Sequence, residues 1–256
     1  MSVNSAIHSD QMMYRLINFL LLGIPLFLLI DSPWATQFIS HGQDICNIIS
    51  IVTYSLFLFY TRGKLYWLIL LMTLCGLAGE IFGSLILRLY EYRLKNIPVY
   101  IPLCHALIYA TVYYTSKRPF MIRNKVKVKQ CLAQFAFVAA FMSLYMIHDI
   151  AGFLGYLTFL IVLRFRKNTL FYLFMFLIVY YVELIGTIFY TWSWYGVTGA
   201  HPHFPTIGIT PSGAAILYVF VDLMVNSIYF YLLKILRFLY RIVPELRIKE
   251  LMTQEN

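Results

Sequence analysis

The sequence predicts an all-α protein that crosses a membrane with eight helices. Of its 256 residues, 61% are hydrophobic and only 12% are charged, and the mean hydropathy is +0.75. This composition leaves too little polar surface to cover a water-soluble fold. Apolar runs of about 17–25 residues, the length that spans a bilayer as a helix, recur along nearly the whole chain. We therefore expect residues 1–256 to form a single transmembrane domain.

The predicted spans follow one another with short connections. The first apolar run ends at Ser32-Pro33-Trp34, which is not a small-residue cleavage site, so we expect this span to remain as an anchor. Basic residues separate the second span from the third, the fourth from the fifth and the sixth from the seventh. The eight predicted spans are residues 16–31, 45–60, 65–87, 98–115, 131–147, 150–163, 169–191 and 212–233.

The basic residues predict the orientation of these spans. With this topology, 17 of the 20 lysines and arginines fall on one side, and only Arg88, Arg93 and Lys95 fall opposite. Cytoplasmic loops carry such an excess, so we expect both termini in the cytoplasm, with a bacterial inner membrane as the location. Topogenic charge facing anionic lipid accounts for the net charge of +9 without nucleic acid. Residues 236–256 form a basic tail, and Lys234 to Lys249 predict an interfacial helix broken at Pro244.

The fifth and sixth spans are predicted to form a short hairpin. Only 34 residues lie between Lys129 and Arg164. Two helices of about 16 residues rise about 24 Å each, less than a hydrocarbon core of about 30 Å. The tip, His148-Asp149, should therefore be sunk in the membrane. It either faces water, a metal or another polar group, or is a turn in which Asp149 caps the next helix.

The chain also resembles itself. Glu80-Ile-Phe-Gly83 recurs as Glu183-Leu-Ile-Gly186. An aromatic pair follows each motif, and the next span begins similarly in both cases. These matches are Tyr90/Tyr92 with Trp192/Trp194, and Pro102–Tyr109 with Pro211–Tyr218. The pattern predicts a four-plus-four parallel repeat, with halves at about 12–116 and 130–235, related by an axis along the membrane normal. The alternative is chance similarity in a biased composition.

Three carboxylates, Glu80, Glu183 and Asp222, lie inside predicted spans. A charged side chain at bilayer depth costs several kcal/mol, so such residues usually face a protein interior and serve a function. We predict them as catalytic residues. Further groups are predicted to line the same cavity or surround its mouth: His105, His148, Asp149, Tyr90, Tyr92, Trp192 and Trp194. For the aromatic residues, simple anchoring at the bilayer interface is the alternative.

This set of residues favours an enzyme of the lyase, hydratase or isomerase type. Burial in a low-dielectric cleft favours the protonated form of a carboxyl group, which can then donate a proton to a hydrophobic, isoprenoid or lipid-linked substrate. The sequence indicates no particular cofactor. A metal site is an alternative, with ligands from Glu80, Glu183, His105, His148 and Asp222. Two further alternatives are a small transporter or channel that uses these acids as a proton or cation relay, and a purely structural role.

One segment is similar to a known family. Glu80, Gly83, Tyr90-x-Tyr92 and Pro98-Val-x-Ile-Pro102-Leu103 resemble the membrane carotenoid hydratase family, in which a span glutamate precedes a Tyr-x-Tyr and a Val-Pro-Leu helix start. The resemblance covers about 30 residues. Ser84–Arg88 replaces the glycine-rich turn of the family. The resemblance implies an isoprenoid substrate and a catalytic role for Glu80.

Overall fold

The computed structural model describes residues 3–242, which form nine α-helices and one two-stranded antiparallel ribbon. The α-helices are α1 (Val3–Ile30), α2 (Gly42–Tyr60), α3 (Lys64–Glu80), α4 (Tyr100–Ser116), α5 (Pro119–Arg123), α6 (Lys125–Ile147), α7 (Ile150–Phe165), α8 (Thr169–Ile188) and α9 (Ala214–Ile242). The shorter elements are η1 (Ala35–Gln37), η2 (Ile81–Ile86), η3 (Thr198–Ala200), β1 (Tyr90–Tyr92) and β2 (Trp192–Trp194). The predicted all-α class is therefore confirmed.

Each of the eight predicted spans contains a helix, and six helical segments are long and apolar enough to cross a membrane. This is compatible with a multi-pass membrane protein. The other two, α4 with 17 residues and α7 with 16, are shorter than the usual transmembrane length of about 20 residues. The count of eight spans thus stays a prediction.

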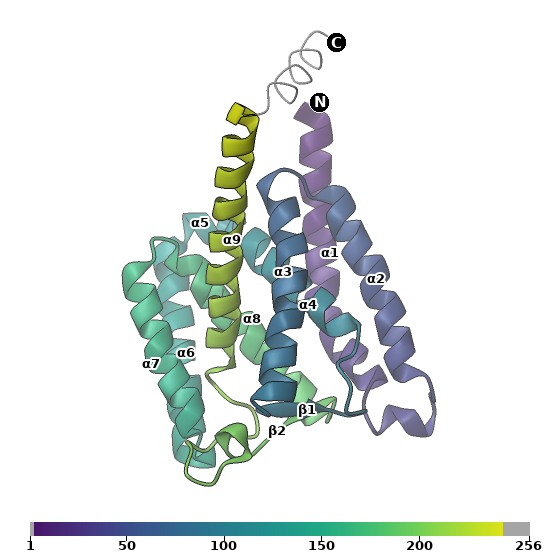
Figure 1. Ribbon diagram of the computed structural model, residues 1–256, viewed down its shortest axis with the longest axis vertical. Helices are drawn as coiled ribbons and strands as arrows, with labels where there is room; N and C mark the ends of the chain where they lie inside the picture. Colours follow the sequence, from purple (N-terminus) through teal and green to yellow (C-terminus); the bar gives the residue numbers. More distant parts are fainter. Residues whose placement is uncertain (1–2, 243–256) are drawn as a thin grey trace.

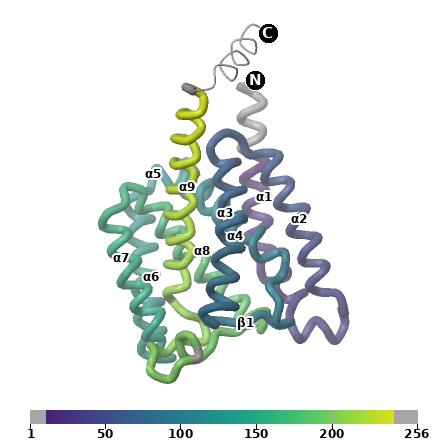
Figure 2. Tube along the Cα trace, in the orientation of Figure 1, coloured from purple at the N-terminus to yellow at the C-terminus, as the bar shows by residue number. Residues whose placement is uncertain are grey.

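Four helices form the centre of the bundle. Helix α3 packs against α4 and α9, and α8 packs against the same two helices, so that the four close a ring. Helices α1 and α2 lie on one side of this ring, and α6 and α7 lie on the other (Figure 1). The start of α1 and the end of α9 lie at one end of the bundle, and the β1–β2 ribbon lies at the opposite end (Figures 1 and 2).

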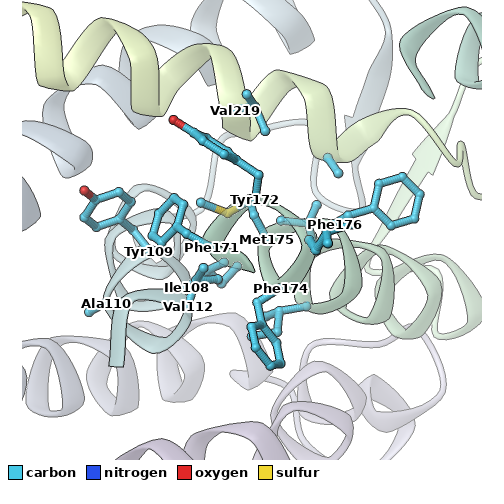
Figure 3. Packing of buried hydrophobic residues seen from close by; sticks show 14 of the residues in the cluster. Ile108, Tyr109, Ala110, Val112, Phe171, Tyr172, Phe174, Met175, Phe176 and Val219 are labelled. Carbon is cyan, nitrogen blue, oxygen red and sulfur yellow. The ribbon is translucent and has the colours of Figure 1, made fainter. Parts of the chain in front are cut away.

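Helix α8 is the most enclosed of the long helices. Of its most apolar stretch, 61% is buried inside the protein, against 22–33% for the other five long apolar helices. Its large side chains pack against α4 and α9, as Figure 3 shows for Ile108, Tyr109 and Val112 of α4, Phe171, Tyr172, Phe174, Met175 and Phe176 of α8, and Val219 of α9. The two lateral helix pairs instead present much apolar surface outward, as expected for helices that face lipid.

The α6–α7 hairpin differs from the prediction of two equally short helices. Helix α6 begins at Lys125 and has 23 residues, because its first turns include Lys125, Lys127 and Lys129, which the sequence analysis placed in a connection. Helix α7 has 16 residues, as expected.

Residues 234–242 of the predicted basic tail are helical and continue α9, which runs unbroken from Ala214 to Ile242. Pro244 and the rest of the predicted basic tail lie outside the described residues.

Candidate functional site

A cavity of about 510 Å³ lies between α1, α2, α3, α4, α8 and α9, next to the β1–β2 ribbon. Seven of the residues predicted from sequence line it: Glu80, Tyr90, Tyr92, His105, Glu183, Trp192 and Trp194. Most of the remaining lining is aliphatic or aromatic. The cavity is therefore an apolar space with a small group of polar side chains at the ribbon end.

Glu80, at the last position of α3, makes three side-chain hydrogen bonds. Its Oε2 accepts from the hydroxyl of Tyr90 at 2.8 Å and from that of Tyr92 at 2.5 Å. Its Oε1 lies 2.7 Å from Nε2 of His105. Glu80 is only 5% exposed, so these donors replace the water that a carboxylate would otherwise bind.

Two glycines make room for the partners of Glu80. A Cβ at Gly76 would lie 2.9 Å from Cβ of His105, so only glycine lets the imidazole pack this closely on α3. A Cβ at Gly83 would lie 3.1 Å from the Tyr90 hydroxyl. Gly83 belongs to the π-helix η2, whose wider turn follows Glu80 directly. Such π-bulges are frequent at functional sites.

The phenol groups of β1 are hydrogen-bond donors in this arrangement. Burial and the Glu80 carboxylate raise the pKa of Tyr90, and they raise that of Tyr92 well above its ordinary value. Both hydroxyls therefore stay protonated at neutral pH and donate to Glu80.

Hydrogen bonds from aromatic side chains also hold Glu183 of α8, but the donors are different residues. Its Oε2 accepts from the indole Nε1 of Trp192 at 2.9 Å and of Trp194 at 3.2 Å. Its other oxygen, Oε1, has no hydrogen-bond partner among the described residues. The Trp192 ring lies directly over Gly186, where a side chain would collide with it.

The two units meet in the β1–β2 ribbon, in which Tyr90 pairs with Trp194 and Tyr92 pairs with Trp192. A corresponding backbone hydrogen bond precedes each strand. Leu89 N donates to Gly83 O at 2.9 Å before β1, and Thr191 N donates to Gly186 O at 3.0 Å before β2. A residue with positive φ stands two positions before each strand, Arg88 (49°) and Tyr190 (53°). The ribbon thus fixes the four aromatic donors of the two glutamates together. These rings were expected around the cavity mouth, and the strands were not predicted from sequence.

The cavity reaches the sides of the bundle. Phe19 and Leu26 of α1 are well over half exposed, and about half of Phe82 of η2 and of Phe220 of α9 is exposed. All four line the cavity. Apolar lining of the cavity is therefore also exposed on the sides of α1, η2 and α9.

Asp222 does not line this cavity, contrary to the expectation of one shared site. It is buried on α9, where its carboxylate accepts from the Tyr172 hydroxyl at 3.0 Å and from the Asn226 amide at 2.8 Å. Tyr109 interacts with Asp222 and Asn226 as well. Asp222 therefore joins α4, α8 and α9 away from the glutamates.

The His148-Asp149 pair also lies elsewhere. Asp149 is the N-cap of α7 and accepts from Gly152 N at 3.0 Å, which confirms the capping alternative. The same carboxylate accepts from Gly208 N at 3.0 Å, and from the backbone and hydroxyl groups of Ser212 at 2.8 and 3.0 Å. Asp149 thereby holds the β2–α9 loop to the hairpin tip. His148 is exposed, has a left-handed backbone, and accepts a bond from the Thr206 hydroxyl at its carbonyl.

The predicted metal ligands are not gathered in one place, because His148 and Asp222 lie apart from the cavity. Within the described residues, no group of three or more His, Cys, Asp or Glu side chains could hold a metal ion.

Two features of the cavity were missed from sequence. The Tyr218 ring of α9 stacks on His105 at 4.4 Å and lines the cavity, although the sequence analysis used Tyr218 only to match Tyr109 in the repeat. Asp31 is buried and binds Arg93 at 2.5 Å and the Tyr100 hydroxyl at 2.8 Å. Tyr100 lines the cavity, so this ion pair supports the wall beside α1. Nothing in the spacing of Asp31 and Arg93 pointed to their contact.

Comparisons of the chain with protein-family models, curated proteins and solved structures found no match.

Proposed function

We propose that this protein is an integral membrane enzyme that carries out acid/base chemistry on a hydrophobic substrate, with Glu80 and Glu183 as the acid/base pair. The observation that carries the proposal is that two buried carboxylates, each held by aromatic hydrogen-bond donors, line one otherwise apolar cavity. Intramembrane carboxylates are costly and are usually functional. Two positioned carboxyl groups can supply one proton and remove another.

The lining of the cavity supports a lipid-like substrate with a double bond. Apolar walls exclude water and favour an isoprenoid or acyl chain. The exposed lining residues on α1, η2 and α9 would let such a molecule enter from the bilayer. The reaction class is protonation of a carbon–carbon double bond, followed by loss of a proton or by addition of water. The similarity of residues 80–103 to carotenoid hydratases is consistent with this class.

The two halves of the chain are proposed to be a duplicated unit. In favour of this, the two glutamates, glycines, positive-φ residues and strands correspond one to one around the antiparallel ribbon. The offset differs by a single residue: Tyr90 is 10 residues after Glu80, whereas Trp192 is 9 after Glu183. The π-helix η2 has an i→i+5 bond from Leu87 N to Phe82 O, and this wider turn holds the extra residue.

We also propose that all eight long helices cross the membrane, with both termini in the cytoplasm of a bacterial cell. The basic residues around α5 support this orientation, because α5 lies at the end of the bundle where the described chain begins and finishes (Figure 1).

Mass spectrometry of the purified protein tests the function. We expect an unsaturated lipid to copurify in detergent, and the wild type to convert the extracted lipid to a hydrated or isomerised product. Glu80→Gln and Glu183→Gln should bind this lipid but lower the conversion at least about 100-fold, the effect of losing one acid/base group. Asp44→Asn is the control, since Asp44 is an exposed carboxylate away from the cavity.

Unchanged conversion in both glutamine variants would refute these roles. If the purified wild type carries no lipid but moves protons across liposomes, and Glu183→Gln abolishes that flux, the protein is a transporter.

A further inference from the structure

The two glutamates have unlike surroundings, although they occupy corresponding places beside the ribbon. We propose that Glu183 is protonated in the resting protein and is the proton donor, whereas Glu80 is ionised and is the proton acceptor. The catalytic meaning of this assignment rests on the proposed function, but the protonation states can be measured without a substrate.

Glu80 is surrounded by donors on both oxygens. Oε2 accepts from two phenols, and Oε1 lies 2.7 Å from Nε2 of His105, which donates to it in the tautomer that carries its proton on Nε2. Tyrosine hydroxyls and an imidazole N–H stabilise the ionised carboxylate, because each donates a hydrogen bond to it. Protonating Glu80 would put a hydroxyl proton against one of these donors. The geometry therefore favours the anion.

Glu183 has donors on one oxygen only. Both indole N–H groups point at Oε2, and an indole cannot accept a proton. Oε1 has no partner among the described residues, and Glu183 is 8% exposed. Among the described side chains, Glu183 forms no ion pair with a lysine or arginine. An ionised carboxylate whose second oxygen accepts no hydrogen bond is costly in this apolar pocket, whereas a carboxylic acid carries no charge there and still accepts both indole hydrogen bonds at Oε2.

The titratable neighbours of Glu183 favour the same state. Those that interact with it are Glu80 from α3, His105 from α4, Tyr218 from α9 and Tyr90 from β1. An ionised Glu80 repels a second negative charge nearby. His105 directs Nε2 at Glu80 and not at Glu183. One negative charge in the pair is thus the stable arrangement.

This assignment gives the reaction a direction. The O–H bond of Glu183 breaks, and the electron pair of the substrate's double bond forms a C–H bond with the released proton. The O–H electron pair stays on the Glu183 carboxylate, and the other carbon of the double bond becomes a cation. The resulting cation then either loses a proton from the neighbouring carbon, which re-forms a double bond, or adds a water molecule that loses a proton. In both cases Glu80 accepts that proton. Its return from Glu80 to Glu183 restores the resting state.

Infrared spectroscopy of the detergent-purified protein at neutral pH tests the inference. The C=O stretching band of a buried protonated carboxyl group should be present in the wild type and in Glu80→Gln, and absent in Glu183→Gln. Asp222→Asn is a control at a buried acid that lies outside the cavity, and we expect it to retain the Glu183 band. Gel filtration and circular dichroism identify variants that do not fold.

The double variant Trp192→Phe/Trp194→Phe keeps the carboxyl group and removes its donors, so it tests the assignment independently of Glu183→Gln. With fewer hydrogen bonds to the carbonyl oxygen, the same band should remain and move to higher frequency. The inference is overturned if the wild type lacks the band, if the band is lost in Glu80→Gln but kept in Glu183→Gln, or if the double variant leaves its frequency unchanged. An enzyme with opposite roles would show the second result and still convert its substrate.

Discussion

Replacing Gly186 by alanine should displace the Trp192 ring and destabilise the protein. A Cβ at this position would lie 2.5 Å from Cε2 of Trp192 and closer still to two other ring atoms. Since an ordinary contact begins at 3.4 Å, the ring must withdraw by about 0.9 Å or more. This movement carries Nε1, which is bonded to Cε2, out of hydrogen-bond range of Glu183, from its present 2.9 Å.

The expected cost combines two effects. Overpacking of a well-filled site costs about 1–3 kcal/mol, and loss of the hydrogen bond costs about 1 kcal/mol more. We therefore expect Gly186→Ala to lower the free energy of unfolding by about 2–4 kcal/mol. Thermal unfolding in detergent, followed by the circular dichroism of the helices, measures the effect as a lower midpoint.

Two other glycines provide matched controls. Gly83→Ala meets the Tyr90 hydroxyl at 3.1 Å, which a shift of a few tenths of an ångström relieves, so its cost should be below that of Gly186→Ala. Gly23→Ala in α1 meets nothing within 4 Å and should stabilise the helix by up to about 1 kcal/mol. If Gly186→Ala unfolds at the same temperature as Gly23→Ala, the close packing of Trp192 on α8 is incorrect.

Two further predictions concern the supports of the site. Arg93→Gln should lower the free energy of unfolding by roughly 3–5 kcal/mol in thermal unfolding, because it leaves Asp31 buried without its counter-charge. Adding Asp31→Asn should recover part of this loss, whereas an equal loss in the exposed control Lys95→Gln would contradict the ion-pair explanation. Asp149→Asn should expose the β2–α9 loop to limited proteolysis, because an amide nitrogen then faces backbone N–H donors. The neighbouring His148→Asn should not, since asparagine tolerates the left-handed backbone there, and equal cleavage of both variants would argue against the Asp149 contacts.

The helices could be predicted from sequence because their signal is local. Apolar run length and the basic residues between runs depend only on neighbouring positions. These signals located all eight long helices and most of their ends, but not the start of α1 at Val3. The errors fall where charged residues extend a helix, as at Lys125 in α6 and beyond Lys234 in α9. Run length records where hydrophobicity stops and not where helical backbone stops.

The site was predicted in part, for a physical reason. Glu80, Glu183 and their aromatic partners were found because the motif spacing repeats within the sequence. Asp222 and Asp149 were predicted to share the cavity with them but make other contacts. For Asp222, an apolar helix does not reveal which of its faces meets a cavity. The stacking of Tyr218 on His105 depends on how α4 and α9 pack, which no local pattern specifies.

The spacing of the hydrogen bonds around the glutamates bears on how the chain enters a membrane. Glu80 finds its three donors within 25 residues of itself, and Glu183 finds its two within 11. Each acid can thus be satisfied by the part of the chain made just after it, before the other half has emerged from the ribosome. A lone carboxylate left waiting in lipid for a distant partner would resist insertion. Locally completed units remove that obstacle, and only the joining of the two strands must wait for the second half to arrive.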